Sequence, residues 1–262
     1  MINSLDFSPP RLHPRCLTVW HRNISVWKKL FGASLLMNFG EPLLYLLGLG
    51  LGLGMFIGDI QGLPYLVFLA SGIVASSAMN TASFEALYSV YTRMIPQRTY
   101  DAMLATPLTV DDIVAGEMLW CASKSLLSGT AILIVAGFLG VVNSPGALLV
   151  IPVLFLIGLC FSGLALIMTS FSKSYDYFSY YFTLFITPMF IFCGVFYPIE
   201  TLPDFLQPIA KVLPLSHAVA LTRPLIAGLP VESAFIHILS LSAYALVGYY
   251  IAIIFIRKRL IV

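Results

Sequence analysis

The sequence contains little charge. Only 10% of its 262 residues are Asp, Glu, Lys or Arg, whereas 59% are hydrophobic. A soluble domain is usually about one quarter charged and about half apolar, so a water-soluble fold of this length would leave much apolar surface uncovered. The composition therefore indicates an integral membrane protein, in which lipid covers the apolar side chains.

The sequence also lacks the short motifs of common enzyme classes. It has no Gly-x-Ser-x-Gly, no His-Glu-x-x-His, no acidic cluster with metal-ligand spacing and no Gly-x-x-x-x-Gly-Lys-[Ser/Thr] phosphate loop. Its four cysteines lie far apart and lack the spacing of a zinc site, so we expect them to act as small apolar residues. We therefore expect a chain that is not an enzyme and binds no cofactor or metal.

Long apolar runs define the predicted architecture. About 20 apolar residues are needed to cross about 30 Å of hydrocarbon. Six runs are long enough, approximately 33–57, 63–89, 113–140, 146–170, 177–197 and 233–256. A seventh apolar stretch, 203–228, contains four prolines, which disrupt a helix interior, so we expect a re-entrant or interfacial helical pair there. The sequence predicts an all-α membrane protein with six transmembrane helices, in which residues 1–262 form a single transmembrane domain.

Lys and Arg are distributed unevenly over the loops between these runs. One predicted side carries 12 of the 14, and the other carries only Lys211 and Arg223. Because Lys and Arg collect in cytoplasmic loops, and six spans return the chain to its starting side, we expect both termini in the cytoplasm.

An amphipathic pattern precedes the first apolar run, over residues 15–31. Apolar side chains recur at steps of three and four, and basic side chains fill other positions. The apolar positions are Leu17, Trp20, Ile24, Trp27 and Phe31. This pattern predicts an N-terminal interfacial helix with its tryptophans toward lipid and its basic residues toward headgroups. The alternative is a frayed cytoplasmic tail.

Glycines recur at alternate positions in the first apolar run. Two Gly-x-x-x-Gly pairs overlap, Gly48 with Gly52 and Gly50 with Gly54. Small residues at this spacing let helices approach closely. The pattern fits a dimer seam and close packing within one subunit equally well.

Four ionisable residues fall within or near the predicted spans: Glu41, Glu85, Glu117 and Lys124. A charge at the bilayer centre costs at least about 2.5–3.5 kcal/mol, so such residues are usually paired or functional. Because most of these four lie near the cytoplasmic ends of their helices, we favour structural pairing between helices over a role in transport.

The loop at residues 93–112 is the longest predicted stretch outside the membrane on the cytoplasmic side. Pro96 and Pro107 bound room for a helix of two to three turns, in which apolar and charged side chains alternate. Thr109 and Asp112 have the spacing of a capping box at the start of the next helix. A short projecting helix suits docking into a groove of a partner, and the alternative is an ordinary connecting loop.

Aromatic residues are concentrated between 171 and 197, which hold 12 of the 35 in the chain. Tyrosine and phenylalanine present broad apolar faces, and tyrosine adds a polar tip, so they could line a path for a sugar-lipid. The candidates are Tyr177, Tyr180, Tyr181 and Phe185. The alternative is that these rings face lipid and the membrane interface, where aromatic residues are common.

Several segments resemble the ABC-2 type permeases, the membrane subunits of ABC exporters. The coupling segment of that family resembles RTYDAMLATPLTVDDIVAGEM (98–118), and its segment before the last helix resembles LPLSHAVALTRPLIAG (213–228). The NodJ subfamily, permeases of lipo-oligosaccharide nodulation-factor export, further resembles WKKLFGASLLMNFGEPLLYLLGLGLGLG (27–54) and SYDYFSYYFTLFITPMF (174–190). The resemblance covers nearly the whole chain.

The resemblance implies a permease dimer in the bacterial inner membrane that binds two copies of a separate ABC ATPase. The ATPase would use ATP and magnesium, and its contacts on this chain would be Arg98, Tyr100, Asp101, Met103 and Leu104. ATP binding would move the helices and push an amphipathic substrate, a lipo-oligosaccharide or a glycolipid, out of the cytoplasmic leaflet. Membrane lipids are the other expected partners, and nucleic acid is not expected. Two alternatives stay open: an exporter of hydrophobic drugs or other lipids, and a membrane assembly factor that transports nothing.

Overall fold

The computed structural model describes residues 7–29 and 31–260, with side chains throughout except at 31, 33–39 and 41. Within these ranges the regular secondary structure is helical, joined by turns and loops, and one isolated bridge links Ile60 and Leu63. The elements are α1 (Cys16–Lys28), α2 (Phe31–Gly52), η1 (Leu53–Met55), α3 (Tyr65–Phe84), η2 (Glu85–Ser89), α4 (Val90–Met94), α5 (Thr99–Leu104), α6 (Val110–Phe138), η3 (Pro145–Leu149), α7 (Val150–Phe171), α8 (Asp176–Tyr181), η4 (Phe182–Ile186), α9 (Thr187–Phe192), η5 (Ile199–Thr201), α10 (Gln207–Val212), α11 (Pro214–Ala227) and α12 (Ala234–Leu260).

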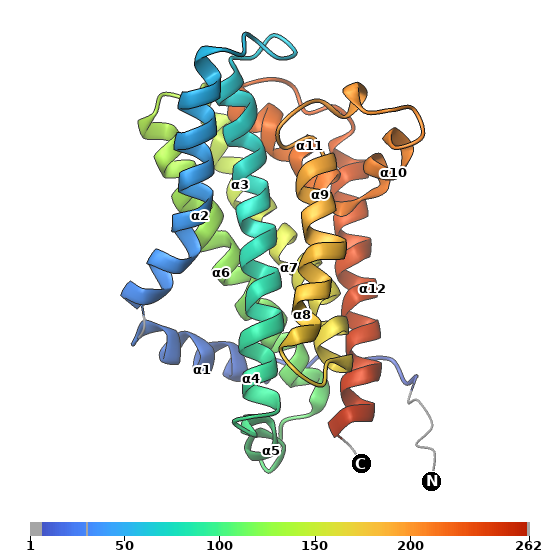
Figure 1. Cartoon of the computed structure of the whole chain (residues 1–262). Coiled ribbons are helices and arrows are strands. Elements are labelled where there is room, and N and C mark those ends of the chain that lie inside the picture. The colour runs from blue at the N-terminus through green and yellow to red at the C-terminus, as the bar shows by residue number, and fades with distance from the viewer. Residues whose placement is uncertain (1–6, 30, 261–262) are drawn as a thin grey trace.

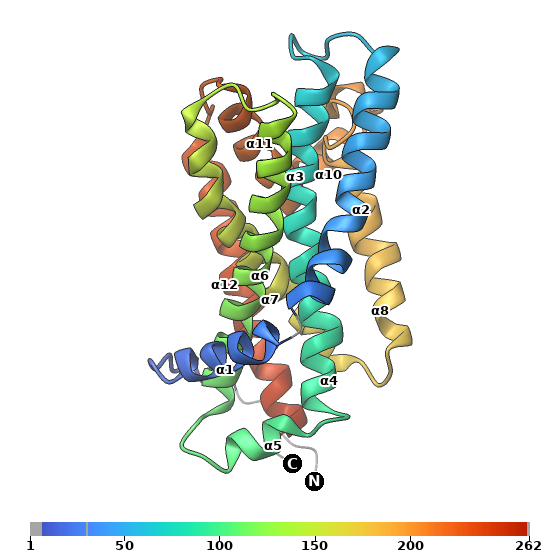
Figure 2. The ribbon, with the colours of Figure 1, turned by 90° about the vertical axis from the view of Figure 1, so that its left-hand side faces the viewer.

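Four helical runs in the part of the chain described are long and apolar enough to cross a membrane. They are Tyr65–Met94, Val110–Phe138, Pro145–Phe171 and Ala234–Leu260, and they confirm four of the six predicted runs as membrane-capable helices. The other two predicted runs are also helical, as α2 and as the unbroken run of α8, η4 and α9. All six lie side by side in the bundle of Figures 1 and 2. The count of six spans stays a prediction.

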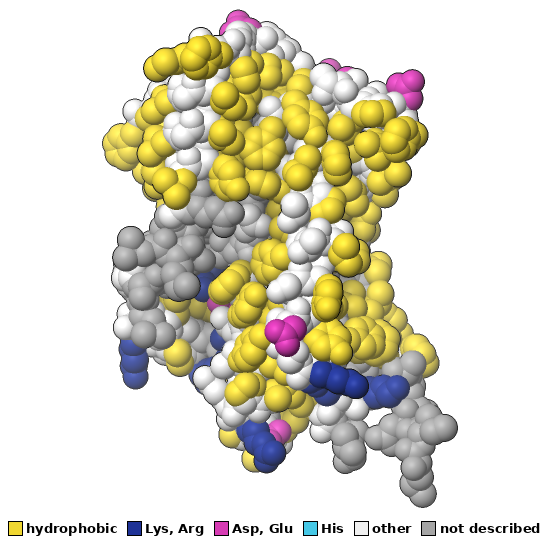
Figure 3. Space-filling view, viewed as in Figure 1, with side chains coloured by type: hydrophobic (Ala, Val, Ile, Leu, Met, Phe, Trp, Pro, Cys, Tyr) yellow, Lys and Arg dark blue, Asp and Glu magenta, His cyan; other side chains and the backbone are white. Residues whose placement is uncertain are grey.

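The two ends of the bundle differ in charge. Both termini lie at one end, together with α1 and α5 (Figure 1), and Figure 3 shows Lys and Arg gathered toward this end below a largely hydrophobic middle. We call it the basic end, and its exposed cations include Arg15, Lys28, Arg98 and Lys258. This arrangement agrees with the uneven charge distribution of the sequence, although it does not place a membrane.

The predicted amphipathic helix forms as α1, which crosses the basic end of the bundle (Figures 1 and 2). Its expected orientation, with tryptophans toward lipid, is wrong. The indole nitrogen of Trp20 donates to Ser123 Oγ at 2.9 Å, and Trp27 packs edge-on against Trp120 with ring centroids 5.9 Å apart. Both tryptophans therefore face α6, because there the indole rings find an aromatic neighbour and a hydrogen-bond acceptor.

Gly116 allows α1 to approach α6 closely. A Cβ atom at this position would lie 2.6 Å from the carbonyl oxygen of Cys16 and 2.6 Å from Cβ of Val19. Both α1 residues are buried against the bundle. Only glycine leaves room for this contact, so α1 is packed onto the protein over its length and is not a frayed tail.

The proline-rich stretch forms the expected helical pair, α10 and α11, at the end opposite the termini (Figure 1). Pro214 begins α11, and Gly228 ends it in the left-handed conformation with φ of 79°, which glycine adopts without strain. Arg223 fastens α11 to α3. Its guanidinium carbon lies 3.5 Å from the centroid of the Phe68 ring, and Nε donates to Ser71 Oγ at 3.1 Å. Whether the pair enters the membrane stays a prediction.

The predicted glycine pairs divide between two environments. A Cβ atom at Gly50 would lie 2.6 Å from Cδ1 of Leu66, so this glycine lets α2 pack against α3. A Cβ atom at Gly48 or Gly52 would meet nothing within 4 Å among the described residues, and one at Gly54 would meet only a ring atom of Tyr65 at 3.9 Å. Gly50 therefore serves packing within one subunit, whereas the open positions leave the dimer seam as a prediction.

Candidate functional site

A buried charge cluster lies near the basic end, where η2, α4 and α6 meet. Arg93 donates to both oxygens of Glu117, at 2.9 and 2.6 Å, and lies 3.3 Å from Glu85 Oε1. Lys124 Nζ donates to Glu85 Oε2 at 2.8 Å. The side chains are at most 13% exposed. Two carboxylates and two cations balance, which a buried cluster requires because an unpaired buried charge is strongly unfavourable.

This cluster confirms the expected pairing for three of the four ionisable residues. Glu117 and Lys124 share α6, yet each pairs with a residue of the α3–η2–α4 helix. Lys124 pairs with Glu85, which is one of the four ionisable residues of the predicted spans, and Glu117 pairs with Arg93; the sequence did not predict which residues would pair. The side chain of Glu41 lies outside the described residues.

Neutral donors complete the buried charge cluster and bring α1 into it. The indole nitrogen of Trp120 donates to Glu85 Oε1 at 2.8 Å, and Ser89 Oγ donates to Glu85 Oε2 at 2.9 Å. Asn23 of α1 donates to Glu117 Oε2 at 2.9 Å. Hydrogen bonds to a charged group contribute about 1.5–3 kcal/mol each, so these donors fix the carboxylates in place.

The short helix between the prolines forms as α5, and one of its side chains joins the cluster. Tyr100 is only 1% exposed, and its hydroxyl lies near enough to Glu117 for the carboxylate to influence its protonation. Burial, reinforced by the Glu117 carboxylate, raises the pKa of the Tyr100 hydroxyl well above its ordinary value, so it stays protonated and able to donate. Tyr100 therefore holds α5 onto the bundle and does not face a partner, contrary to our expectation.

The other predicted coupling residues lie outside the cluster. Arg98 and Asp101 are exposed, and Met103 and Leu104 are half-buried beside the hydrophobic core. The helix has six residues, fewer than the expected two to three turns, and Arg98 precedes it in the left-handed conformation with φ of 49°. The exposed face of α5 thus offers a small mixed surface to a partner.

The capping box after α5 is confirmed, and it begins α6. The Asp112 backbone N–H donates to Thr109 Oγ1 at 3.2 Å, and the Thr109 N–H donates to Asp112 Oδ2 at 3.0 Å. Such reciprocal bonds satisfy two amide groups that a helix start leaves without partners. The N-terminus of α6 is therefore fixed shortly after the end of α5, within the loop 93–112.

A second buried ion pair lies at the start of α6. Arg257, near the end of α12, donates to both oxygens of Asp111, at 2.8 and 2.6 Å. The backbone N–H of Arg11 donates to Asp111 Oδ2 at 2.8 Å, and Arg257 also donates to the carbonyl oxygen of Ser8 at 3.0 Å. We call this the terminal clasp, because it binds both end segments of the chain to one carboxylate.

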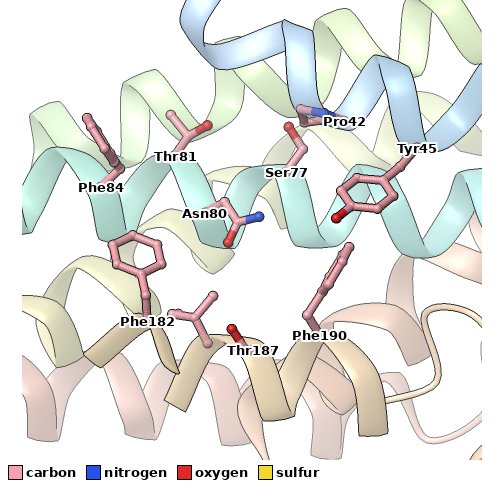
Figure 4. Close-up of a pocket in the computed structure, with 10 residues that line it drawn as sticks. Pro42, Tyr45, Ser77, Asn80, Thr81, Phe84, Phe182, Thr187 and Phe190 are labelled. Atoms are coloured by element: carbon pink, nitrogen blue, oxygen red, sulfur yellow. The ribbon is translucent and has the colours of Figure 1, made fainter. Parts of the chain in front are cut away.

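A pocket of about 320 Å³ lies between α2, α3 and the α8–η4–α9 helix. Figure 4 shows Asn80 and Thr187 pointing toward one another from opposite helices, with an aromatic pair at each end. The residues lining it are Pro42, Tyr45, Ser77, Asn80, Thr81, Phe84, Phe182, Ile186, Thr187 and Phe190. Apolar walls with a few convergent polar groups are typical of small-molecule sites. This lining suits a ligand that has both hydroxyl groups and apolar faces.

Aromatic contacts border both ends of the pocket. At one end Tyr45 packs against Phe190, with ring centroids 5.5 Å apart. At the other end, toward the basic end, Phe84 stacks on Tyr88 at 4.4 Å, and both rings lie 6.5 Å from Phe182. We call Phe84, Tyr88 and Phe182 the pocket floor.

The predicted substrate-path residues lie on the α8–η4–α9 helix, which borders the pocket, but on faces that do not line it. Tyr177, Tyr180 and Phe185 are exposed, and Tyr181 is buried. None of the four lines the pocket, which is lined instead by residues four apart on a neighbouring face: Phe182, Ile186 and Phe190. A role for the four in transport stays a prediction.

The sequence reading missed the polar side of the pocket. Ser77, Asn80 and Thr81 are spaced by three and one on α3, so they share one helix face. A polar stripe of this kind inside an apolar run is the signal that could have identified the pocket, because polar groups at membrane depth are unfavourable unless they serve a contact.

The chain was compared with known proteins. The family model described as ABC-2 type transporter matches residues 14–226. Nodulation protein J of Rhizobium leguminosarum bv. viciae is 45% identical over 244 residues, which are 93% of this chain and 94% of that protein. Nodulation protein J of Rhizobium meliloti is 43% identical over 93% of both chains. The inner membrane transport permease YadH of Escherichia coli is 24% identical over 78% of this chain and 79% of its own length.

Proposed function

Because the chain belongs to the ABC-2 type transporter family, we propose that it is the permease of an ATP-driven exporter that moves an amphipathic substrate, a lipo-oligosaccharide or a glycolipid, out of the cytoplasmic leaflet. It is an integral membrane protein and a permease component, and ATP hydrolysis belongs to a separate subunit. The substrate class is what the resemblance to the NodJ subfamily implies, since the name nodulation protein J states no substrate.

The pocket is the observation that carries the substrate proposal. Asn80, Ser77 and Thr187 supply donors and acceptors for sugar hydroxyls, and the aromatic walls supply faces for sugar rings or an acyl chain. Its volume of about 320 Å³ is at the lower end of the range for ligand sites, about 300–1,000 Å³. One chain would therefore hold only part of such a substrate, and a second copy would complete the path.

The exposed face of α5 is the proposed contact for the ATPase. Arg98 and Asp101 point outward and can pair with charges on a partner, whereas Tyr100 holds α5 to the bundle. Two ATPase copies, one per permease, would bind ATP and magnesium, and this chain would bind neither.

The proposed setting is a bacterial inner membrane with the basic end in the cytoplasm. Lys and Arg favour that side, and anionic headgroups would contact the exposed cations of α1. The helix α2 and the α8–η4–α9 helix would supply the two remaining spans.

Reconstitution with a copurifying ATPase in lipid nanodiscs tests this function. We expect ATP hydrolysis to rise on addition of a glycolipid, and Asn80→Leu to reduce that stimulation. Thr183→Val, at an exposed position of the facing helix that does not line the pocket, serves as the matched control and should keep it. Stimulation by hydrophobic drugs alone would favour the second exporter hypothesis. Failure to recover any ATPase with the permease would favour an assembly factor.

A further inference from the structure

The long helix that contains the pocket residues of α3 is interrupted by a π-helical turn. Residues Glu85–Ser89 form η2, between α3 and α4, in one unbroken run from 65 to 94. π-Helical turns are rare and are found frequently at functional sites. A second one, Phe182–Ile186, forms η4 in the helix across the pocket. The pocket floor joins the two, since Phe84 precedes η2 and Phe182 begins η4.

One side of η2 belongs to the buried charge cluster. Glu85 is 4% exposed, and its carboxylate accepts hydrogen bonds from Lys124 and Trp120 of α6 and contacts Arg93 of α4. Arg93 in turn holds Glu117, whose carboxylate lies near the buried Tyr100 of α5. Glu85 is thus joined through Arg93 and Glu117 to the place where α5 packs on the bundle.

The other side of η2 belongs to the pocket floor. Tyr88 stacks on Phe84 and meets Phe178 of α8 edge-on, with ring centroids 5.0 Å apart. Neighbouring residues on a helix project about 100° apart, so a rotation of this turn that displaces Glu85 also displaces Phe84. The buried charge cluster and the pocket floor therefore share one continuous segment of backbone.

We propose that η2 transmits the movement of α5 and α6 to the pocket floor, with Glu85 as the positioning residue that holds the turn in register. This inference rests on the proposed function as an ATP-driven exporter. Displacement of α5 shifts Glu117 and Arg93, and this changes the ion pair between Arg93 and Glu85. The π turn then rotates, since its hydrogen bonds differ from those of an α-helix by one residue, and Phe84 and Tyr88 move away from Phe182. Coupling of this kind requires one element that both sites contact and bias, and η2 contacts both the buried charge cluster and the pocket floor.

Cysteine labelling in the pocket tests the proposal. The permease with its copurifying ATPase is placed in nanodiscs with Asn80→Cys, and the labelling rate by a soluble maleimide is measured without nucleotide and with ATP and vanadate. The four native cysteines are buried, so they give a low background. In the otherwise unchanged chain we expect the rate to differ at least about fivefold between the two conditions, the lower limit of typical coupling.

Glu85→Gln should reduce this difference to less than about twofold, because the neutral amide no longer pairs with Lys124 and Arg93. Glu85→Asp keeps the charge and should keep part of the difference. The matched control is Asp111→Asn, which breaks a buried ion pair of the terminal clasp and should leave the nucleotide effect in place. If Glu85→Gln retains the full effect, Glu85 does not transmit movement.

Tyr88→Leu is a second variant, which keeps all charges of the cluster. It removes the stacking on Phe84 and should raise labelling without nucleotide. Unchanged labelling in this variant would contradict the role of the pocket floor. If Glu85→Gln failed to fold, the labelling of Tyr88→Leu would by itself test whether η2 acts on the pocket floor. If the complex hydrolyses ATP but neither Glu85→Gln nor Tyr88→Leu changes the labelling of Asn80→Cys, this inference is overturned and the proposed function stands. A permease that binds no ATPase overturns the proposed function as well.

Discussion

Replacing Arg93 with methionine tests the buried charge cluster directly. Arg93 contacts Glu117 at 2.6 and 2.9 Å and Glu85 at 3.3 Å, and Glu117 is fully buried. Removing one partner of a buried ion pair costs about 3–5 kcal/mol, because the remaining charge is left uncompensated. Lys124 still compensates Glu85, so the main loss falls on Glu117. We expect Arg93→Met to lower the free energy of unfolding by about 3–5 kcal/mol.

The assay is reversible unfolding in mixed micelles, followed by tryptophan fluorescence, for a double-mutant cycle. Glu117→Gln removes the charge that Arg93 compensates, so the double variant should be more stable than additive losses predict by about 1–3 kcal/mol. The control is Arg15→Met, since Arg15 is exposed and donates to the Pro107 carbonyl oxygen at 2.8 Å. It should cost about 0.5–1.5 kcal/mol. Equal losses for Arg93→Met and Arg15→Met, or additive losses in the cycle, would refute the compensation argument.

Three further predictions concern packing and pH. Gly116→Val should cost about 1–3 kcal/mol in unfolding free energy, because its Cβ would lie 2.6 Å from the carbonyl oxygen of Cys16. A Cβ at Gly48 meets no described atom within 4 Å, so Gly48→Val should change the free energy of unfolding of the monomer by no more than about 0.5 kcal/mol. A loss as large as that of Gly116→Val would contradict the packing described. Burial, and then the His237 ring at 2.8 Å, lower the pKa of His217, so the unfolded chain binds its proton more readily. The contribution of neutral His217 to stability is therefore present above about pH 6.5 and falls as the pH is lowered below that value. In His217→Gln the melting temperature should change less between about pH 7.5 and pH 5 than it does in the unchanged chain.

Local pattern was sufficient to predict the helices. Apolar runs predicted the membrane-capable helices, the prolines predicted the separate pair α10 and α11, and Thr109 with Asp112 predicted the start of α6. Each of these depends on neighbours within a few residues. The sequence therefore contains the information locally, and no knowledge of helix packing is needed.

The facing of side chains could not be predicted in this way. Trp20 and Trp27 have the pattern of lipid-facing residues, yet they contact α6, because Ser123 and Trp120 supply better partners than the interface. The density of aromatic residues identified the helix that borders the pocket, but not the face that lines it. Charged residues were predicted to pair, but their partners depend on how α3 and α6 pack together.

The terminal clasp has a mechanical consequence. Asp111 holds the end of α12 and the segment around Arg11 against the start of α6. These three segments are therefore joined to one another at the basic end. A displacement of α6 at the basic end would therefore carry the end of α12 and the segment around Arg11 with it, whereas α3 and the α8–η4–α9 helix make no hydrogen bond to Asp111 in the part of the chain described.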